Sequence, residues 1–244
     1  MTTRTSVVLQ AFTELAPTYE ETVDREVREF CGVGYREFIG QLAAMVTAGD
    51  GSLVLDVASG TAISSLEIAE CAGPGVRIIG LDITPAMQAL GAQNIARAGR
   101  GDQISQICAS AMAIPFAANS FEAVICGLGT HHMDVSALLT QIARVLKPGG
   151  HLLLADIGAP PRWRTPWGRV IMQAIVSFVR IARRSARWQA ESDAFMSIHT
   201  ASEWGELLRR YGFGDTQVSE SPGRKFWHPN LVIIKAVNEG ATWR

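Results

Sequence analysis

The chain has 244 residues and a formal net charge of -1 at pH 7, which argues against a dedicated nucleic-acid-binding protein, because such proteins carry a basic excess. Hydrophobic residues make up 48% and charged residues 18%, so we expect a folded chain with a substantial core. The four cysteines form no CxxC pair, so neither a disulfide framework nor a zinc site is suggested. The first residues lack the features of a signal peptide and no apolar window is long enough to span a membrane, so we expect a soluble, cytoplasmic protein.

Short apolar runs alternate with helix-like segments from about residue 51 onward. Strands are predicted at 53–57, 76–82, 103–110, 121–129, 151–158 and 231–237. Helices are predicted at 63–71, 85–98, 134–146 and 201–213, with Thr84 and Asp134 as N-caps and KPGG at 147–150 as a closing turn. Five alternations of strand and helix at this spacing predict an α/β fold with a parallel sheet covered by helices on both faces.

Two segments lie outside this alternation. Residues 1–50 are predicted to form a helical cap before the sheet, and residues 159–200 an insertion after the fifth strand. We therefore expect a single domain made of the cap (1–50), a cofactor-binding core (51–158), an inserted lid (159–200) and a C-terminal helix with a strand pair (201–244).

The first strand leads into LVLDVASGTAIS, residues 53–64, where a carboxylate is followed by a turn of small residues. Ligands of open parallel sheets bind beyond the carboxyl ends of the strands, where Asp56 and Asp82 end the first two strands. Asp82 is placed to accept hydrogen bonds from both hydroxyls of a ribose. The alternative is that Asp82 caps the next helix, a position that Thr84 already fills. The single glycine of ASGTA and the lack of a P-loop lysine give little support for a pyrophosphate site.

An ordered series of motifs resembles the class I S-adenosylmethionine-dependent methyltransferases, of the small-molecule type similar to ubiquinone and menaquinone C-methyltransferases. VLDVASGTA resembles the glycine-rich first motif, GLDITPAM the acidic second motif, and ASAMAIPFAANSFEAVIC the adenine-binding segment and fourth strand. HHMDVSALLTQIARVLKPGGHLLLAD resembles the following helix and fifth strand, and AFTELAPTYEETV the segment that folds over the cofactor. The resemblance implies a doubly wound, mostly parallel seven-stranded Rossmann-like sheet whose last strand is antiparallel. GDTQVSE and LVIIKAV fit its final strand pair.

The resemblance also implies S-adenosylmethionine as cofactor and S-adenosylhomocysteine as product. Residues at the turn would contact the methionine part, together with Gly127, while Asp82 would hold the ribose and Tyr19 would close the pocket. The residues that it assigns to the adenine are Ile83, Ser110, Ala111 and Met112. The full predicted cofactor-binding set is Tyr19, Asp56, Ala58, Ser59, Gly60, Asp82, Ile83, Met87, Ser110, Ala111, Met112 and Gly127.

Three departures from the common pattern of this family involve four positions. Ala58 and Ala62 stand where glycines are common, so a positive φ at Ala62 would cost about 1–2 kcal/mol, whereas a helical φ would cost nothing. Ser110 replaces the acid expected beside the adenine amino group, and Glu122 replaces the aspartate common in the fourth strand. These departures keep open a cyclase or rearrangement enzyme that uses the cofactor non-reactively, and a non-catalytic binding protein.

Methyl transfer needs alignment, exclusion of water and, for carbon or phenolic acceptors, a base. The candidate bases are His131 and His132 after the fourth strand and His199 at the end of the insertion; His228 could also face the pocket. The alternative for the histidine pair is a structural role, with hydrogen bonds to the backbone. The sequence shows no metal-ligand cluster.

The insertion carries seven of the 22 basic residues and no acid between 160 and 190. Its apolar helix, GRVIMQAIVSFVRIA, is open to three interpretations: a lid packed on the sheet, a membrane-surface lid admitting a lipophilic substrate such as a prenylated quinol, and a pocket for an anionic substrate. We expect transfer of a methyl group to carbon or oxygen of an apolar or aromatic small molecule, with a lean towards secondary metabolism and no nucleic-acid partner. The oligomeric state stays open.

Overall fold

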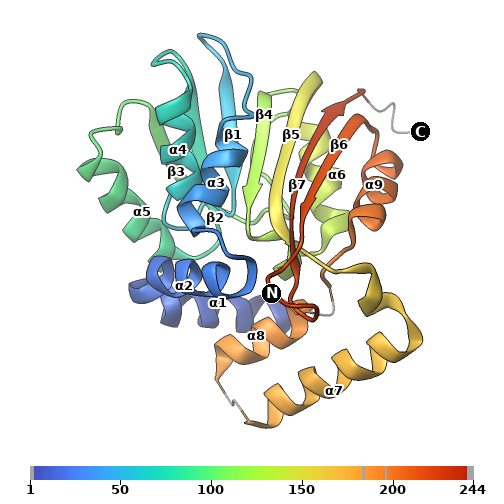
Figure 1. The fold of residues 1–244 in the computed structure, drawn as a ribbon. Coiled ribbons are helices and arrows are strands. Elements are labelled where there is room, and N and C mark those ends of the chain that lie inside the picture. Colours follow the sequence, from blue (N-terminus) through green and yellow to red (C-terminus); the bar gives the residue numbers. More distant parts are fainter. Residues whose placement is uncertain (1–2, 183–184, 196, 241–244) are drawn as a thin grey trace.

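The computed structural model describes residues 3–182, 185–195 and 197–240; Arg183 and Arg184 of the basic insertion lie outside them. The described strands form one seven-stranded sheet in the order β3-β2-β1-β4-β5-β7-β6 (Figure 1). The strands are β1 (Leu53–Val57), β2 (Arg77–Asp82), β3 (Ile104–Cys108), β4 (Phe121–Gly127), β5 (Leu146–Gly158), β6 (Phe213–Ser221) and β7 (Asn230–Asn238). Strands β1 to β5 are parallel, and β7 runs antiparallel to both β5 and β6. This arrangement confirms the predicted doubly wound, mostly parallel sheet.

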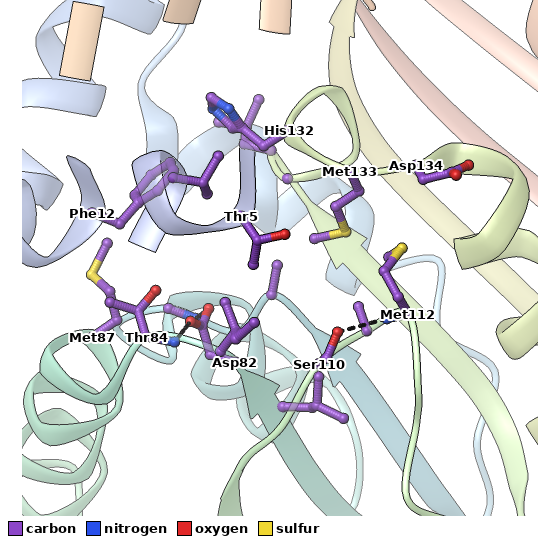
Figure 2. Close-up of a pocket in the computed structure, with 18 of the residues that line it drawn as sticks. Thr5, Phe12, Asp82, Thr84, Met87, Ser110, Met112, His132, Met133 and Asp134 are labelled. Carbon is purple, nitrogen blue, oxygen red and sulfur yellow. Dashed lines mark hydrogen bonds between the residues drawn. The ribbon is translucent and has the colours of Figure 1, made fainter. Parts of the chain in front are cut away.

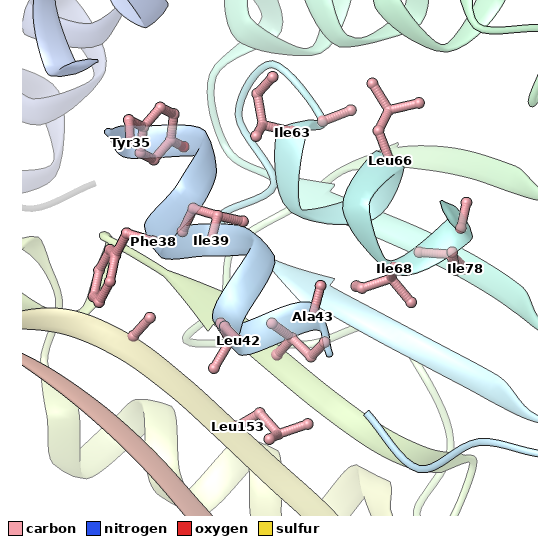
Figure 3. Close-up of a cluster of buried hydrophobic side chains, with 14 of the residues drawn as sticks. Tyr35, Phe38, Ile39, Leu42, Ala43, Ile63, Leu66, Ile68, Ile78 and Leu153 are labelled. Atoms are coloured by element: carbon pink, nitrogen blue, oxygen red, sulfur yellow. The ribbon is translucent and has the colours of Figure 1, made fainter. Parts of the chain in front are cut away.

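Helices cover both faces of the sheet because its central strands are apolar on both sides. Val54 packs into one cluster with α3 (Tyr35–Ala43), α4 (Ile63–Cys71) and α5 (Pro85–Arg97), as Figure 3 shows in part. The next residue, Leu55, packs into a second cluster with α6 (Val135–Val145) and α9 (Ala201–Arg210). Successive side chains of a strand point to opposite faces, so each central strand contributes to both clusters.

One predicted boundary is wrong. The segment 147–150 was expected to be a turn, but β5 already begins at Leu146. Leu146 is fully buried, and the side-chain amide of Asn238 donates to the carbonyls of Ala143, Leu146 and Lys147 at 3.1–3.3 Å. This amide holds the end of α6 and the start of β5 in place. The pairing of β4 with β5 shifts register between Phe121 and Ala123.

The predicted N-terminal cap is helical. It consists of α1 (Thr3–Leu15), the 3-10 turn η1 (Ala16–Thr18), α2 (Tyr19–Cys31) and α3. Helix α1 packs against α8 (Ala186–Phe195) of the insertion, and Arg187 of α8 forms an ion pair with Glu26 of α2. The cap and the insertion, which are far apart in sequence, therefore meet beside the same edge of the sheet (Figure 1).

The apolar helix of the insertion is α7 (Pro166–Ala182), which follows the 3-10 turn η3 (Pro161–Arg164). It does not pack on the sheet, as the first interpretation required, but extends away from it beside α8 (Figure 1). Met172 and Val176 are its buried side chains, whereas Trp167 and Phe178 are 79% and 72% exposed. Within the described ranges, no helix has the length and apolar character needed to cross a membrane.

Candidate active site

In the turn after β1, every second residue has a left-handed backbone conformation. Ala58, Gly60 and Ala62 have φ angles of 58°, 52° and 66°. The amide of Ser59 donates to the carbonyl of Leu81 at 3.1 Å, which ties the turn to β2. Ala62 is thus not helical, and both alanines carry the strain, about 1–2 kcal/mol each, that glycine would avoid.

The carboxylate of Asp82 fixes this turn from the end of the neighbouring strand. Its Oδ2 accepts the amide of Gly60 at 3.0 Å, and its Oδ1 accepts the amide of Thr84 at 2.7 Å. Burial raises the pKa of Asp82, an effect that these amides partly offset. Thr84 occupies the predicted N-cap position of α5, although its side chain makes no capping hydrogen bond. Asp82 therefore supports the start of α5, as the capping alternative expected, and it also lines the cavity, where the ribose role stays a prediction.

A cavity of about 790 Å³ lies beyond the carboxyl ends of the strands (Figure 2). This volume is in the upper part of the range for small-molecule sites, roughly 300–1,000 Å³. Ten of the predicted residues line it: Tyr19, Ala58, Gly60, Asp82, Ile83, Met87, Ser110, Ala111, Met112 and His132. The structure thus brings together most of the residues that the sequence assigned to one site.

The wall opposite the strand ends comes from residues that the sequence analysis did not single out. Helix α1 contributes Thr5, Val8 and Phe12, and the segment after β4 contributes Leu128 and Met133 (Figure 2). The segment AFTELAPTYEETV, which resembles a cofactor cover, includes Phe12 but begins after Thr5 and Val8. The spacing of Val8 and Phe12 could have indicated this wall, because residues four apart share one face of a helix.

Five predicted residues lie outside the lining. Ser59 is buried in the turn, and Asp56 is fully buried, where Oδ2 accepts the hydroxyl of Ser65 at 2.6 Å. Gly127 is needed for packing, since an added Cβ would lie 2.8 Å from Ile39 and 3.0 Å from the hydroxyl of Ser64.

The two remaining residues are histidines. His131 points into the protein, while His199 lines a separate cavity with Trp163 and Arg164, packs on the ring of Trp204 and has a pKa lowered by burial. Of the three predicted catalytic histidines, His132 alone lines the main cavity.

His131 is held by a buried carboxylate rather than by the backbone. Its Nδ1 lies 2.6 Å from Oδ1 of Asp156, and Oδ2 of Asp156 accepts the amide of Thr130 at 2.8 Å. Burial lowers the pKa of His131, but the negative charge of Asp156 outweighs it, so the net shift is upward. The same pair holds the pKa of Asp156 below its usual range, although burial alone would raise it. The structural alternative for His131 expected a backbone partner, whereas Nδ1 of its ring pairs with the side chain of Asp156.

His132 occupies the border between the cavity and the insertion. Its ring meets Phe12 edge to face, with centroids 5.0 Å apart, and lies 4.3 Å from the ring of His131. Its Nε2 is 4.0 Å from Oε1 of Glu191 on α8. The imidazole of His132, at the wall of the cavity, thus lies beside groups from both the cap and the insertion.

Comparison with known proteins identifies the class of this site. Residues 54–150 match the methyltransferase domain family. The demethylmenaquinone methyltransferase of Listeria welshimeri is 28% identical over 233 residues, which are 93% of this chain and 96% of the relative. The geranyl diphosphate C-methyltransferase of Streptomyces coelicolor, solved with S-adenosyl-L-homocysteine, has a TM-score of 0.62 and 15% identity over 83% of this chain and 78% of that one. The chain is an S-adenosylmethionine-dependent methyltransferase, similar to the class I enzymes of this kind.

A further solved structure shows what the fold alone leaves open. The [4+2]-cyclase SpnF has a TM-score of 0.63 and 17% identity, over 84% of the methyltransferase chain and 82% of its own. Identity at this level shows a common fold and no more, and the same fold supports methyl transfer and cyclisation. The match to the methyltransferase family and the relative from Listeria therefore decide the class of enzyme.

The lining residues of the methyltransferase fit its cofactor, S-adenosylmethionine. The space above Gly60 is open, since an added Cβ would meet only the carbonyl oxygen of Ala58, at 3.9 Å, so a ligand can approach the backbone. Asp82 offers a carboxylate at the same place, and the side chains of Ile83 and Ala111 offer apolar contacts for an adenine. The hydroxyl of Ser110 accepts the amide of Met112 at 3.2 Å and keeps a second lone pair for a ligand.

The stability of the methyltransferase should fall with rising pH because of Asp56. Burial raises the pKa of Asp56 to about 7, against 3.8 when unfolded. Between these values the unfolded state binds fewer protons, so this group's contribution becomes steadily less favourable from about pH 4 to 7 and then levels off. In Asp56→Asn we expect this pH-dependent loss of stability to be absent. At pH 8 its free energy of unfolding should be about 1–2 kcal/mol higher than that of the native protein. This gain is smaller than the roughly 4 kcal/mol of the full shift, because the new amide hydrogens are poorly satisfied.

Urea unfolding of both proteins at pH 4, 6 and 8 measures this difference. Ser65→Ala is the control that removes the hydrogen bond to Asp56 without removing the charge, and it should steepen the pH dependence. Parallel curves for the native protein and Asp56→Asn would contradict the assignment.

Proposed function

We propose that the methyltransferase acts on a carbon or oxygen of an apolar, aromatic small molecule of the quinol class. The observation that carries the proposal is the composition of the cavity beyond the cofactor-binding residues. That part is walled by Val8, Phe12, Leu128 and Met133, with His132 as a base beside them. Apolar walls with one convergent polar group suit a flat aromatic acceptor, and the relative from Listeria is a demethylmenaquinone methyltransferase.

The predicted roles of the site residues follow from their positions. Asp82 would bind the ribose hydroxyls, the turn 58–60 would contact the methionine part, and Tyr19 would close the pocket beside Phe12. S-adenosylmethionine supplies the electrophilic methyl group when bound. The apolar walls exclude water, which favours in-line attack by the acceptor. His132 would accept the proton that the acceptor loses as its new bond to the methyl group forms.

The test is incubation with S-adenosylmethionine and a reduced demethylmenaquinone that has a short prenyl chain. We expect methylated quinol and S-adenosylhomocysteine in equal amounts by mass spectrometry. The matched control is the quinol that already carries the ring methyl, which should give neither product. Cofactor that binds tightly but is never consumed with quinols or phenols would contradict the proposal and favour the cyclase alternative.

The exposed face of α7 supports a lipophilic acceptor taken from a membrane surface. Large apolar side chains follow one another along this helix, all more than 40% exposed: Trp167, Val170, Ile171, Ile175, Phe178 and Ile181. Exposed Phe226 and Trp227 adjoin the start of the insertion, where Arg162 stacks on Phe226 at 4.5 Å from its centroid. Residues 160–190 contain no acid, so the surface combines apolar and basic groups, as in helices that lie on anionic lipid.

We expect the methyltransferase to sediment with vesicles of phosphatidylcholine and phosphatidylglycerol. The double variant Trp167→Ser, Phe178→Ser should lose roughly 2–4 kcal/mol of apolar burial, which weakens vesicle binding by about 30-fold or more. Ser177→Ala on the same helix is the matched control and should bind like the native protein. If the double variant sedimented with vesicles as well as the native protein does, a lipid partner would be contradicted. A lipid partner would also be contradicted if the native protein bound no vesicles and formed a dimer in gel filtration that the double variant disrupts.

A further inference from the structure

Three side chains with metal-ligating atoms meet at the border between the cavity and the insertion. His131 and His132 belong to the 3-10 turn η2 (Thr130–His132), and Glu191 belongs to α8. One ligand atom from each residue lies within 4.8 Å of the others. In a tetrahedral zinc site, ligand atoms at roughly 2.0–2.2 Å from the ion lie about 3.4 Å from one another, so combined side-chain movements of roughly an ångström would close the site.

His131 is already oriented as a metal-binding histidine usually is. Its Nδ1 faces Oδ1 of Asp156 at 2.6 Å, and both side chains are buried. A carboxylate at one ring nitrogen fixes the tautomer and raises the basicity of the other nitrogen, which is the arrangement around many ligating histidines. Asp156 is itself held by the amides of Thr130 and Ile157 at 2.8 and 2.7 Å. The imidazole is therefore aimed by a rigid support.

The carboxylate of Glu191 is placed to complete a ligand set with the two imidazoles. Its Oε1 lies 4.0 Å from Nε2 of His132, and its side chain is 34% exposed, so it can move towards an ion without disturbing the core.

We propose that His131, His132 and Glu191 bind one divalent transition-metal ion, with zinc as the best match. Two imidazoles and one carboxylate form a ligand set of catalytic zinc sites, which keep a further position open. That position faces the cavity, because His132 lines it. The site also joins α8 of the insertion to the turn after β4.

The inference deepens the proposed function and rests on it for its role in the reaction. An acceptor hydroxyl in the open position would lose its proton at lower pH, because the ion stabilises the oxyanion. Coordination would then replace deprotonation by an unligated His132. Metal binding itself requires neither acceptor nor cofactor, so it can be tested separately from methyl transfer.

The experiment is titration of the chelator-treated methyltransferase with cobalt(II) alone, followed by absorption in the visible region, and then displacement of cobalt by zinc. We expect one ion per chain with the intense absorption of four- or five-coordinate cobalt. Glu191→Gln should weaken binding about 100-fold, and Asp156→Asn about 10–100-fold through the loss of orientation. His199→Gln, a histidine in the other cavity, is the matched control and should bind like the native protein.

Thermal unfolding in the presence of chelator shows whether each variant is folded before titration. Glu191 is partly exposed, so Glu191→Gln should fold normally. Absence of a cobalt spectrum in the native protein would overturn the proposal. So would a spectrum that Glu191→Gln leaves unchanged, because the ion would then be bound at other groups. Retained methyl transfer by the metal-free protein would leave the proposed function intact while removing the ion from it.

Discussion

Asp82→Ala should lose at least about 100-fold in affinity for S-adenosylmethionine and S-adenosylhomocysteine, as measured by calorimetry. The carboxylate is proposed to accept hydrogen bonds from two ribose hydroxyls, and hydrogen bonds to charged groups contribute roughly 1.5–3 kcal/mol each. It also holds the turn through the amide of Gly60, so its removal loosens the backbone that would contact the methionine part. Both effects act in the same direction.

Asp134→Ala is the matched control for this variant. Asp134 also lines the cavity, and its carboxylate also accepts two backbone amides, those of Ser136 and Ala137 at 3.0 and 3.1 Å. Its removal should cost about 1 kcal/mol of stability as a lost helix cap, with little change in cofactor affinity. Equal losses of affinity in the two variants would show that the effect of Asp82→Ala comes from a disturbed cavity rather than from a ribose contact.

Asp156→Ala should lower the free energy of unfolding by about 3–5 kcal/mol. Asp156 is 1% exposed and is paired with His131, which is also buried. Removing one partner of a buried ion pair leaves the other charge without compensation, and several amides and the hydroxyl of Thr130 lose their acceptor. Urea denaturation, followed by circular dichroism, measures the difference.

Two comparisons separate the buried pair from general effects. Asp156→Asn keeps one acceptor oxygen, which can serve either Thr130 or His131, and should lose less than the alanine variant. Asp24→Ala removes an exposed pair with Arg28, at 2.7 Å, and one hydrogen bond from the amide of Tyr35, so its loss should be clearly smaller than that of Asp156→Ala. If Asp156→Ala were as stable as Asp24→Ala, the interaction with His131 would contribute nothing to the fold.

The order of strands and helices could be predicted from the sequence because it depends on local patterns. Alternating apolar segments, the small residues after Val57 and the carboxylate of Asp82 place the ligand edge of the sheet without knowledge of distant contacts. The same reasoning could not separate Asp56 from the cavity, because its burial depends on Ser65 and α4 packing above it. Nor could it reveal that Gly127 is required by Ile39 of the cap.

The insertion shows a second limit of sequence reasoning. The apolar face of α7 has the same pattern whether it packs on the sheet or faces solvent, so the pattern predicts the helix but not its partner. Glu191 is far in sequence from the histidine pair, and only the packing of α8 against α1 and η2 brings them together. Clusters assembled by tertiary packing leave no spacing signature in the chain.

The antiparallel direction of β7 has a practical consequence for handling the enzyme. β7 starts at Asn230 beside the cavity edge and carries the chain to Asn238, at the opposite edge of the sheet (Figure 1). The exposed turns at Gly51 and Gly101 lie on that same far edge, before the starts of β1 and β3, as does exposed Gly149 within the first residues of β5. A fluorophore or a surface linker attached there would leave the cavity and the apolar face of α7 directed outward. Immobilised enzyme oriented in this way would present both to a supported bilayer.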